Sequence, residues 1–305
     1  MLVSSLLLLV ALQDSPATRT ERDVVYRTVA DVGGKDVEAQ SGERKELELK
    51  LDAYLPVGDG IHPALLLVHG GAWIHGGKGD MHTFGELYAK AGYACFSLDY
   101  RLAPRARWPA QIEDCLYAVQ WVRSQAAHYH VDPARVGALG LSAGGHLVAL
   151  LGVLDEKRDA HASDPVLHES SRVQCVVDYF GPVLLTRTKE HDDDLQPPPD
   201  LFGDVPDAAR FDALLAGASP LTLVTADDAP FLIVHGDADE IVPVQQSKRM
   251  DEALRAVHVP SELLLIPGGG HGDFFFKDPH GAYWERSAAF LAERLMKAKP
   301  APPAH

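Results

Sequence analysis

Residues 140–145, with the sequence GLSAGG, place a single serine among small residues where a strand gives way to a helix. The run before them, residues 135–139, is a short apolar strand, and residues 146–154 are apolar nearly all round, as in a buried central helix. A sharp strand-to-helix turn strains its middle residue, and flanking glycines admit the neighbouring chain without a Cβ clash. Ser142 is therefore a candidate nucleophile, although the pattern alone fits an ordinary structural turn equally well.

A glycine-rich loop upstream of the serine offers backbone hydrogen-bond donors. Residues 64–68, ALLLV, form a continuous apolar strand that ends in HGGAW at residues 69–73. Acyl transfer by a serine needs donors for the developing oxyanion, and loops of this HGGG type provide them in lipases and esterases. Ala72 replaces the third glycine, which keeps the N–H donor and narrows the space for an acyl group. The N–H of Ala143, after the serine, is a further candidate donor.

Two later strand ends carry a candidate acid and a candidate base. Residues 231–234, FLIV, are followed by a cluster of acids in which Asp237 and Asp239 both fit. Residues 261–266 form another strand, after which His271 stands among glycines. The chain order of serine, acid and histidine is that of an α/β-hydrolase and differs from the two other common serine triads.

The rest of the chain alternates strands with helices. We expect strands at residues 24–30, 46–55, 93–98 and 173–179, and helices at residues 109–127, 245–257 and 283–297. Leucines alternate with polar residues over 46–55, the pattern of a sheet edge. This order predicts an α/β fold with a mostly parallel central sheet flanked by helices, in which ligands bind at the carboxyl ends of the strands.

Taken together, these motifs resemble the α/β-hydrolase carboxylesterases, and more narrowly the BD-FAE-like esterases that neighbour the hormone-sensitive-lipase group. The likeness covers nearly all of the chain and rests on residues 69–73, 99–104, 140–146, 219–222, 235–239 and 270–272. It implies a catalytic triad of Ser142, Asp239 and His271, because the acid of this family stands four residues after the histidine of its HGxxD stretch.

The resemblance also implies an oxyanion hole built from the N–H groups of Gly71, Ala72 and Ala143. Trp73 follows this loop directly, and we place it in the substrate pocket, with a core position equally open. The implied activity is serine carboxylic-ester hydrolysis of short-chain, acetyl-sugar or hydroxycinnamoyl esters, free or linked to polysaccharide, with no cofactor. An amide-cleaving relative, such as an arylformamidase or an oligopeptidase-like hydrolase, would use the same triad. A non-catalytic binding module is disfavoured because all three triad residues are present.

Several other polar residues have structural explanations. We expect His69 to order the oxyanion loop and His146 to pack beneath the nucleophile turn. The charges at residues 113–114 and 237–240 fall at a helix start and a strand end, where charges are usually structural. The resemblance implies that residues 99–101, DYR, form a buried ion pair that braces the loop.

Composition narrows the possible partners. The chain of 305 residues has 28 Lys and Arg against 43 Asp and Glu, a formal net charge of −15. A nucleic-acid partner is therefore not expected, because phosphate binding needs clustered positive charge. The spacing of the 15 histidines matches no metal motif. Cys95, Cys115 and Cys175 are scattered and odd in number, which indicates core residues and no disulfide framework.

The chain is predicted to consist of one hydrolase domain over residues 23–297. Residues 1–22 are interpreted as a signal peptide and polar linker, which favours a periplasmic or secreted location over a cytoplasmic one. Their apolar run is too short for stable membrane insertion, and it has neither a preceding Lys or Arg nor an A-x-A site. Residues 181–228 interrupt the alternation, and a cap over the pocket and a solvated loop explain them equally well. Residues 298–305 are predicted to be a disordered tail.

Overall fold

The computed structural model describes residues 17–30, 46–191, 194–278 and 281–296. Within these residues, eight strands form one sheet in the order β1-β2-β4-β3-β5-β6-β7-β8. The strands are β1 (Thr18–Ala30), β2 (Glu46–Pro56), β3 (His62–Val68), β4 (Ala94–Leu98), β5 (Val131–Leu141), β6 (Val176–Tyr179), β7 (Phe231–Gly236) and β8 (Ser261–Ile266). β2 pairs antiparallel with β1 and β4, and every other neighbouring pair is parallel.

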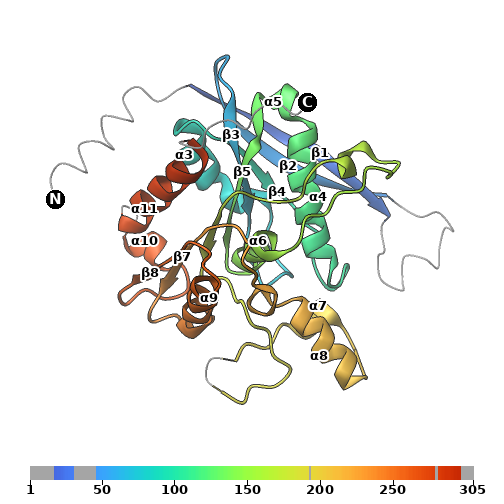
Figure 1. The fold of residues 1–305 in the computed structure, drawn as a ribbon, viewed down its shortest axis with the longest axis vertical. Helices are drawn as coiled ribbons and strands as arrows, with labels where there is room; N and C mark the ends of the chain where they lie inside the picture. Colours follow the sequence, from blue (N-terminus) through green and yellow to red (C-terminus); the bar gives the residue numbers. More distant parts are fainter. Residues whose placement is uncertain (1–16, 31–45, 192–193, 279–280, 297–305) are drawn as a thin grey trace.

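Helices connect the strands and lie on both sides of the sheet (Figure 1). The α-helices are α3 (His82–Lys90), α4 (Ala110–Ser124), α5 (Ala126–Tyr129), α6 (Ala143–Val153), α7 (Pro199–Phe202), α8 (Ala208–Gly217), α9 (Val244–Ala256), α10 (Phe274–Lys277) and α11 (Ala282–Leu291). Shorter helical turns are η1 (Lys78–Met81), η2 (Pro165–His168), η3 (Pro220–Leu223) and the π-helical η4 (Ala292–Met296). The predicted α/β fold with a mostly parallel sheet is confirmed.

The central strands are apolar throughout because both of their faces are buried. In β3, Leu65 and Leu67 pack in a cluster with residues of α3 and α11. Leu66 and Val68 point the other way, into a cluster with residues of α4, α6 and α9. Successive side chains of a strand alternate between the two faces, so a strand covered on both sides has apolar residues at every position.

The prediction that residues 46–55 lie at a sheet edge is wrong. β1 pairs along the outer side of β2, from the pair of Thr18 and Pro56 to the pair of Ala30 and Glu46. The strand begins at Thr18, so residues 18–22 of the predicted polar linker belong to the sheet. Only Tyr26 is buried in β1, which explains why residues 18–23, ahead of the strand predicted at 24–30, gave no apolar pattern. Charged side chains on an edge strand also oppose pairing with other chains.

Between β6 and β7 the chain leaves the sheet. Figure 1 shows α7 and α8, in yellow and gold, standing off the main body at one end of the molecule. This excursion carries most of the predicted insertion at residues 181–228. The two flanking strands nevertheless pair directly, with Val176 opposite Phe231 and Tyr179 opposite Val234.

The remaining predictions concern the two ends of the chain and the three cysteines. Residues 1–16, which hold most of the predicted signal peptide, and the predicted tail at residues 298–305 lie outside the described residues. No helix in the described part has the length and apolar character needed to cross a membrane. Cys95, Cys115 and Cys175 are free and buried, as expected of core residues. Cys175 immediately precedes β6, whereas the strand was expected to include it.

Candidate active site

Ser142 occupies a strained turn between β5 and α6. Its backbone has φ 54° and ψ −117°, a conformation that L-residues rarely adopt. Its N–H donates to the carbonyl of Tyr179, 2.9 Å away, on the neighbouring strand. A Cβ atom on Gly140 would lie 2.2 Å from the carbonyl oxygen of Gly144, and one on Gly144 would lie 2.1 Å from that of Val68. Only glycine fits at these two positions, which is the physical reason for the glycines of the motif.

Three side chains from separate strand ends meet in a line of hydrogen bonds. Nε2 of His271 lies 2.9 Å from the hydroxyl oxygen of Ser142. Nδ1 of the same ring lies 2.7 Å from Oδ2 of Asp239. Asp237, which the spacing left open as the acid, instead accepts a hydrogen bond from the N–H of Gly268 at 2.6 Å. The structure therefore brings together the serine, histidine and acid that the resemblance selected.

The carboxylate of Asp239 is buried and strongly hydrogen-bonded. Its Oδ1 accepts from the N–H groups of Ile241 and Val242, at 2.8 and 2.9 Å. Burial on its own would raise the pKa of Asp239, but hydrogen bonds from His235, His271 and Val242 outweigh it and hold the pKa well below its usual range. The carboxylate is thus ionised at neutral pH and can stabilise a positive charge on the neighbouring imidazole.

The loop after β3 forms a tight turn that exposes backbone donors. Gly71 has φ 107° and Ala72 has φ 51°. The carbonyl of Gly71 accepts from the N–H groups of Ile74 and His75, at 3.0 and 2.9 Å. Within the described residues, the N–H groups of Gly71 and Ala72 have no acceptor. Ala143 opens α6, where the first N–H groups have no partner inside the helix.

Two histidines near the turn are buried and uncharged supports. Nδ1 of His69 lies 2.7 Å from the carbonyl of Gly70, and its ring stacks on Tyr100 with centroids 4.3 Å apart. Nε2 of His146 donates to the carbonyl of Ala218 at 2.6 Å. Burial lowers the pKa of His69, and it lowers that of His146 to about 4. Both occupy the supporting positions expected from the sequence.

A cavity of about 890 Å³ opens beside Ser142. Ala72, Trp73 and Ala143 line it close to the serine. Trp73 is only 3% exposed and also belongs to the main core cluster. It therefore lies both in the wall of the cavity and in the core, the two positions that the sequence left open. The other walls come from the excursion between β6 and β7, through residues 182, 189 and 194–199, and from the segment after β7, through residues 237 and 239–245. The excursion therefore contributes directly to the site.

The predicted ion pair within residues 99–101 has a different acid from the expected one. Two guanidinium nitrogens of Arg101 donate hydrogen bonds to the carboxylate of Asp114, at 2.8 and 2.9 Å. The side chain of Asp114 is 0% exposed. Asp99 instead accepts from the backbone N–H of Lys78 at 2.7 Å. The partner of Arg101 is thus the acid on α4 that was expected to be structural, and the pair ties the loop after β4 to that helix.

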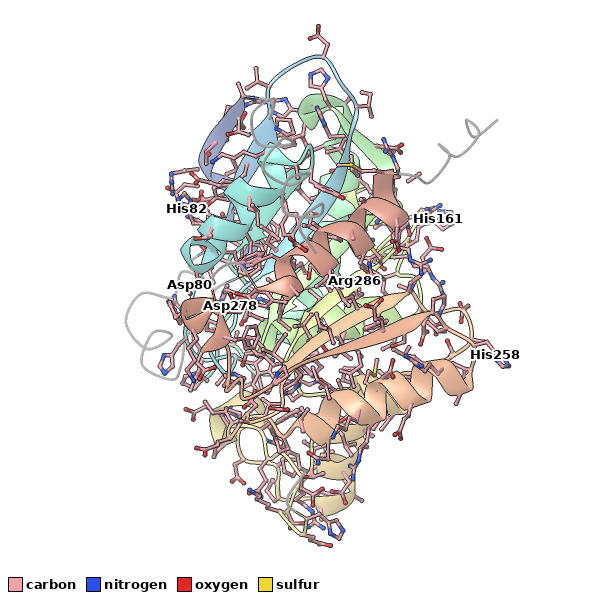
Figure 2. The ribbon with its side chains drawn as sticks, turned by 90° about the vertical axis from the view of Figure 1, so that its left-hand side faces the viewer. Asp80, His82, His161, His258, Asp278 and Arg286 are labelled. Atoms are coloured by element: carbon pink, nitrogen blue, oxygen red, sulfur yellow. The ribbon has the colours of Figure 1, made fainter. Side chains whose placement is uncertain are left out.

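The histidines in the described residues do not gather into a metal site. In the described part of the chain, no three histidine, cysteine or acidic side chains are placed to hold a metal ion. Figure 2 shows His82 on the opposite side of the molecule from His161 and His258 in that view. Their number reflects separate surface and core positions.

Two buried residues near the site were missed by sequence reasoning. His235 contacts Asp239 through Nε2, 3.2 Å from Oδ2, and was read only as part of a motif. Asp178 lies at the end of β6, where Oδ1 accepts from the N–H of Gly181 at 2.8 Å. Burial raises the pKa of Asp178 to about 6. A lone acid inside the apolar run VVDYF was the available signal for Asp178.

The strand order, the nucleophile turn between β5 and α6, and the acid and histidine after β7 and β8 define an α/β-hydrolase. Residues 51–254 match the BD-FAE family model. The chain belongs to the BD-FAE family.

Individual relatives agree with this assignment. The chain is 34% identical over 219 residues to esterase LipC of Mycobacterium tuberculosis, covering 69% of this chain and 53% of the relative. It spans about half the length of the curated relatives that it matches first. A truncated carbohydrate esterase from gut microbiota superposes with a TM-score of 0.72 at 28% identity, covering 93% of this chain and all of that one. The esterase Est2 of Thermogutta terrifontis gives 0.69 at 26% identity, covering 90% and 92%.

Proposed function

We propose that this chain hydrolyses carboxylic esters through an acyl-enzyme formed on Ser142. The observation that carries the proposal is the unbroken line of hydrogen bonds from Asp239 through His271 to the serine hydroxyl, at 2.7 and 2.9 Å. Relatives that are named esterases support the same reaction.

In the first half of the reaction, Nε2 of His271 takes the serine proton while the hydroxyl oxygen attacks the ester carbonyl. The carbonyl oxygen becomes an anion and is held by the N–H groups of Gly71, Ala72 and Ala143. The histidine then gives its proton to the departing alcohol, leaving the acyl group on the serine.

In the second half, water takes the place of the alcohol. His271 removes a proton from the water, which attacks the acyl-enzyme and passes through a second oxyanion in the same hole. The acid leaves and the serine regains its proton. Throughout, Asp239 orients the imidazole and stabilises its charged form without itself taking the proton.

The walls of the cavity support an ester of a neutral, hydroxyl-rich alcohol. Polar side chains of Lys189, Asp194 and Gln196 line the wall that comes from the excursion, beside a run of three prolines. Asp237 and Glu240 also line the cavity and would repel an anionic substrate. Short-chain acyl groups, acetylated sugars and hydroxycinnamoyl esters of polysaccharide are the proposed substrates, in line with the carbohydrate esterase among the structural relatives.

The test is turnover of p-nitrophenyl acetate by the purified chain and by Ser142→Ala. Activity in the parent protein, and its loss in a variant with unchanged circular dichroism, is the expected result. Acetyl-xylan, methyl ferulate, a formylated aniline and a peptide, assayed side by side, identify the acyl substrate. Full activity in Ser142→Ala, or cleavage of the amides alone, would remove the proposal.

We also propose export of the protein, on the basis of the apolar run at residues 2–12. Because Thr18 already pairs in the sheet, a cleavage that preserves β1 would fall before it. Cell fractionation followed by amino-terminal sequencing tests this, and an uncleaved protein in the cytoplasm would contradict it.

A further inference from the structure

Two histidines contact the same oxygen of Asp239. Nδ1 of His271 lies 2.7 Å from Oδ2, and Nε2 of His235 lies 3.2 Å from it. The other ring nitrogen of His271 contacts the hydroxyl of Ser142. His235 lies at the end of β7, just before the loop that carries Asp239. The side chains of His235 and Asp239 are both 0% exposed. Their contact is therefore made away from bulk water, where a hydrogen bond to a charged group is strongest.

The surroundings of His235 determine where its hydrogen lies. Its Nε2 faces two acceptors, Oδ2 of Asp239 and the carbonyl of Val242, the latter at 2.9 Å. Because neither group can donate, Nε2 carries the hydrogen and shares it between them. Nδ1 lies 2.6 Å from the hydroxyl oxygen of Ser247 on α9, which can donate to it. With a hydrogen on Nε2, both ring nitrogens are satisfied in one tautomer.

This arrangement closes a ring of hydrogen bonds around the acid. Val242 accepts from His235 through its carbonyl and donates to Oδ1 of Asp239 through its N–H, at 2.9 Å in both cases. The N–H of Ile241 supplies a second donor to Oδ1. Oδ1 thus has two backbone donors, and Oδ2 has the N–H of His271 and the nearby Nε2 of His235, so the carboxylate cannot rotate without breaking several contacts.

Three further acids lie near this ring. Asp178 at the end of β6 interacts electrostatically with His235, and Asp273, in the turn before α10, interacts with Asp239. Asp237 lies in the same loop and is turned toward the N–H of Gly268. The N–H of His235 next to Oδ2 therefore offsets part of the negative charge around Asp239. This offset also acts on His271, which contacts the same oxygen.

We propose that His235 is a positioning residue for ester hydrolysis, holding Oδ2 of Asp239 in line with His271 and moderating the negative charge that His271 experiences. The inference rests on the proposed function. Loss of the Nε2 donor frees the carboxylate to rotate, which lowers kcat. It also leaves Oδ2 more negative, so that the protonated form of His271 is favoured and the acidic limb of the pH profile moves to higher pH.

The decisive pair of variants is His235→Phe, which has no donor, and His235→Gln, which keeps an N–H at similar reach. For His235→Phe we expect kcat on p-nitrophenyl acetate to fall about tenfold, with KM changed by less than about twofold. The acidic limb of its kcat/KM profile moves upward by about half a pH unit or more. His235→Gln restores most of kcat and the original limb. A fall in kcat with an unmoved limb in His235→Phe would reduce His235 to a packing residue and overturn the proposal.

A measurement on the unsubstituted protein covers the case in which His235→Phe does not fold. Long-range proton–nitrogen NMR spectra of histidine-labelled protein report which ring nitrogen carries the hydrogen. We expect His235 to carry a hydrogen on Nε2, because both groups that face this nitrogen can only accept. A hydrogen on Nδ1 alone would overturn the proposal. This readout does not depend on turnover, so an inactive parent protein would refute the proposed function and leave the contact with Asp239 separately testable.

Discussion

The indole N–H of Trp73 donates to Nδ1 of His146, 3.2 Å away, and the two rings meet edge to face with centroids 5.1 Å apart. The other ring nitrogen of His146 donates to the carbonyl of Ala218, so the imidazole is fixed from both sides. Since Trp73 lines the cavity next to Ser142, the buried histidine fixes the orientation of one wall of this cavity.

Removing that wall should change the acyl preference. In Trp73→Ala we expect the ratio of kcat/KM for p-nitrophenyl octanoate to that for the acetate to rise about tenfold or more, because each methylene that a pocket admits is worth about 1–3 kcal/mol. Trp108→Ala is the matched control, since its ring also lies against His146, at 5.8 Å, but does not line the cavity. An equal rise in both variants would show that the effect comes from general loosening.

The choice of acid can be tested within one loop. Asp239→Asn should lower kcat by about 10³–10⁴, because an amide cannot stabilise the charged imidazole and favours the wrong tautomer. Asp237→Asn should lower kcat by less than about threefold, since Asp237 accepts a hydrogen bond from the backbone N–H of Gly268 and the amide oxygen of asparagine can still accept it. Steady-state assays at pH 8 compare the two. Comparable losses would argue against Asp239 as the acid.

Asp178 should make stability depend on pH in an unusual direction. Its pKa in the folded protein, about 6, lies above the ordinary value of 3.8, so folding favours the protonated form. The free energy of unfolding should therefore decrease as the pH rises from about 4 to about 6, by about 3 kcal/mol from this group alone. Asp178→Asn should lose this component. Urea unfolding of both proteins across the window checks it, and parallel pH profiles would contradict it.

The ion pair beneath the loop after β4 should matter for folding. Asp114→Asn leaves Arg101 without its buried partner, and we expect the free energy of unfolding to fall by about 3–5 kcal/mol. Glu113→Gln is the control, because Glu113 also contacts Arg101, at 3.1 Å, but is 51% exposed. Its effect should stay below about 1 kcal/mol. Urea denaturation measures the free energy of unfolding of both variants. Similar small losses would show that the ion pair of Arg101 and Asp114 does not stabilise the fold.

Much of the fold could be predicted because its strands are covered on both faces. The continuous apolar run at residues 64–68 identifies a buried strand without any knowledge of its neighbours in the sheet. β1 could not be recognised in full, since an edge strand with one buried side chain, Tyr26, lacks that signal. The misreading of β2 followed from this, because its alternation at the amino end indicates partial exposure and gives no information about neighbours.

The candidate site was predictable where a motif constrains the backbone and unpredictable where contacts join distant residues. Gly140 and Gly144 mark the nucleophile turn because no other residue fits there. The partner of Arg101 lies on the following helix, and its identity depends on how that helix packs. The contact of His235 with Asp239 requires the loop to curl back onto its own strand, which residue types alone do not specify.

The direct pairing of β6 with β7 has an evolutionary consequence. The excursion between them supplies a wall of the cavity but none of the ladder that holds the two strands together. Parts of the excursion that only line the cavity can therefore be exchanged among relatives, whereas Ala218, whose carbonyl holds His146 beneath the nucleophile turn, has to be kept. Substrate range in such a lineage can diversify faster than its chemistry.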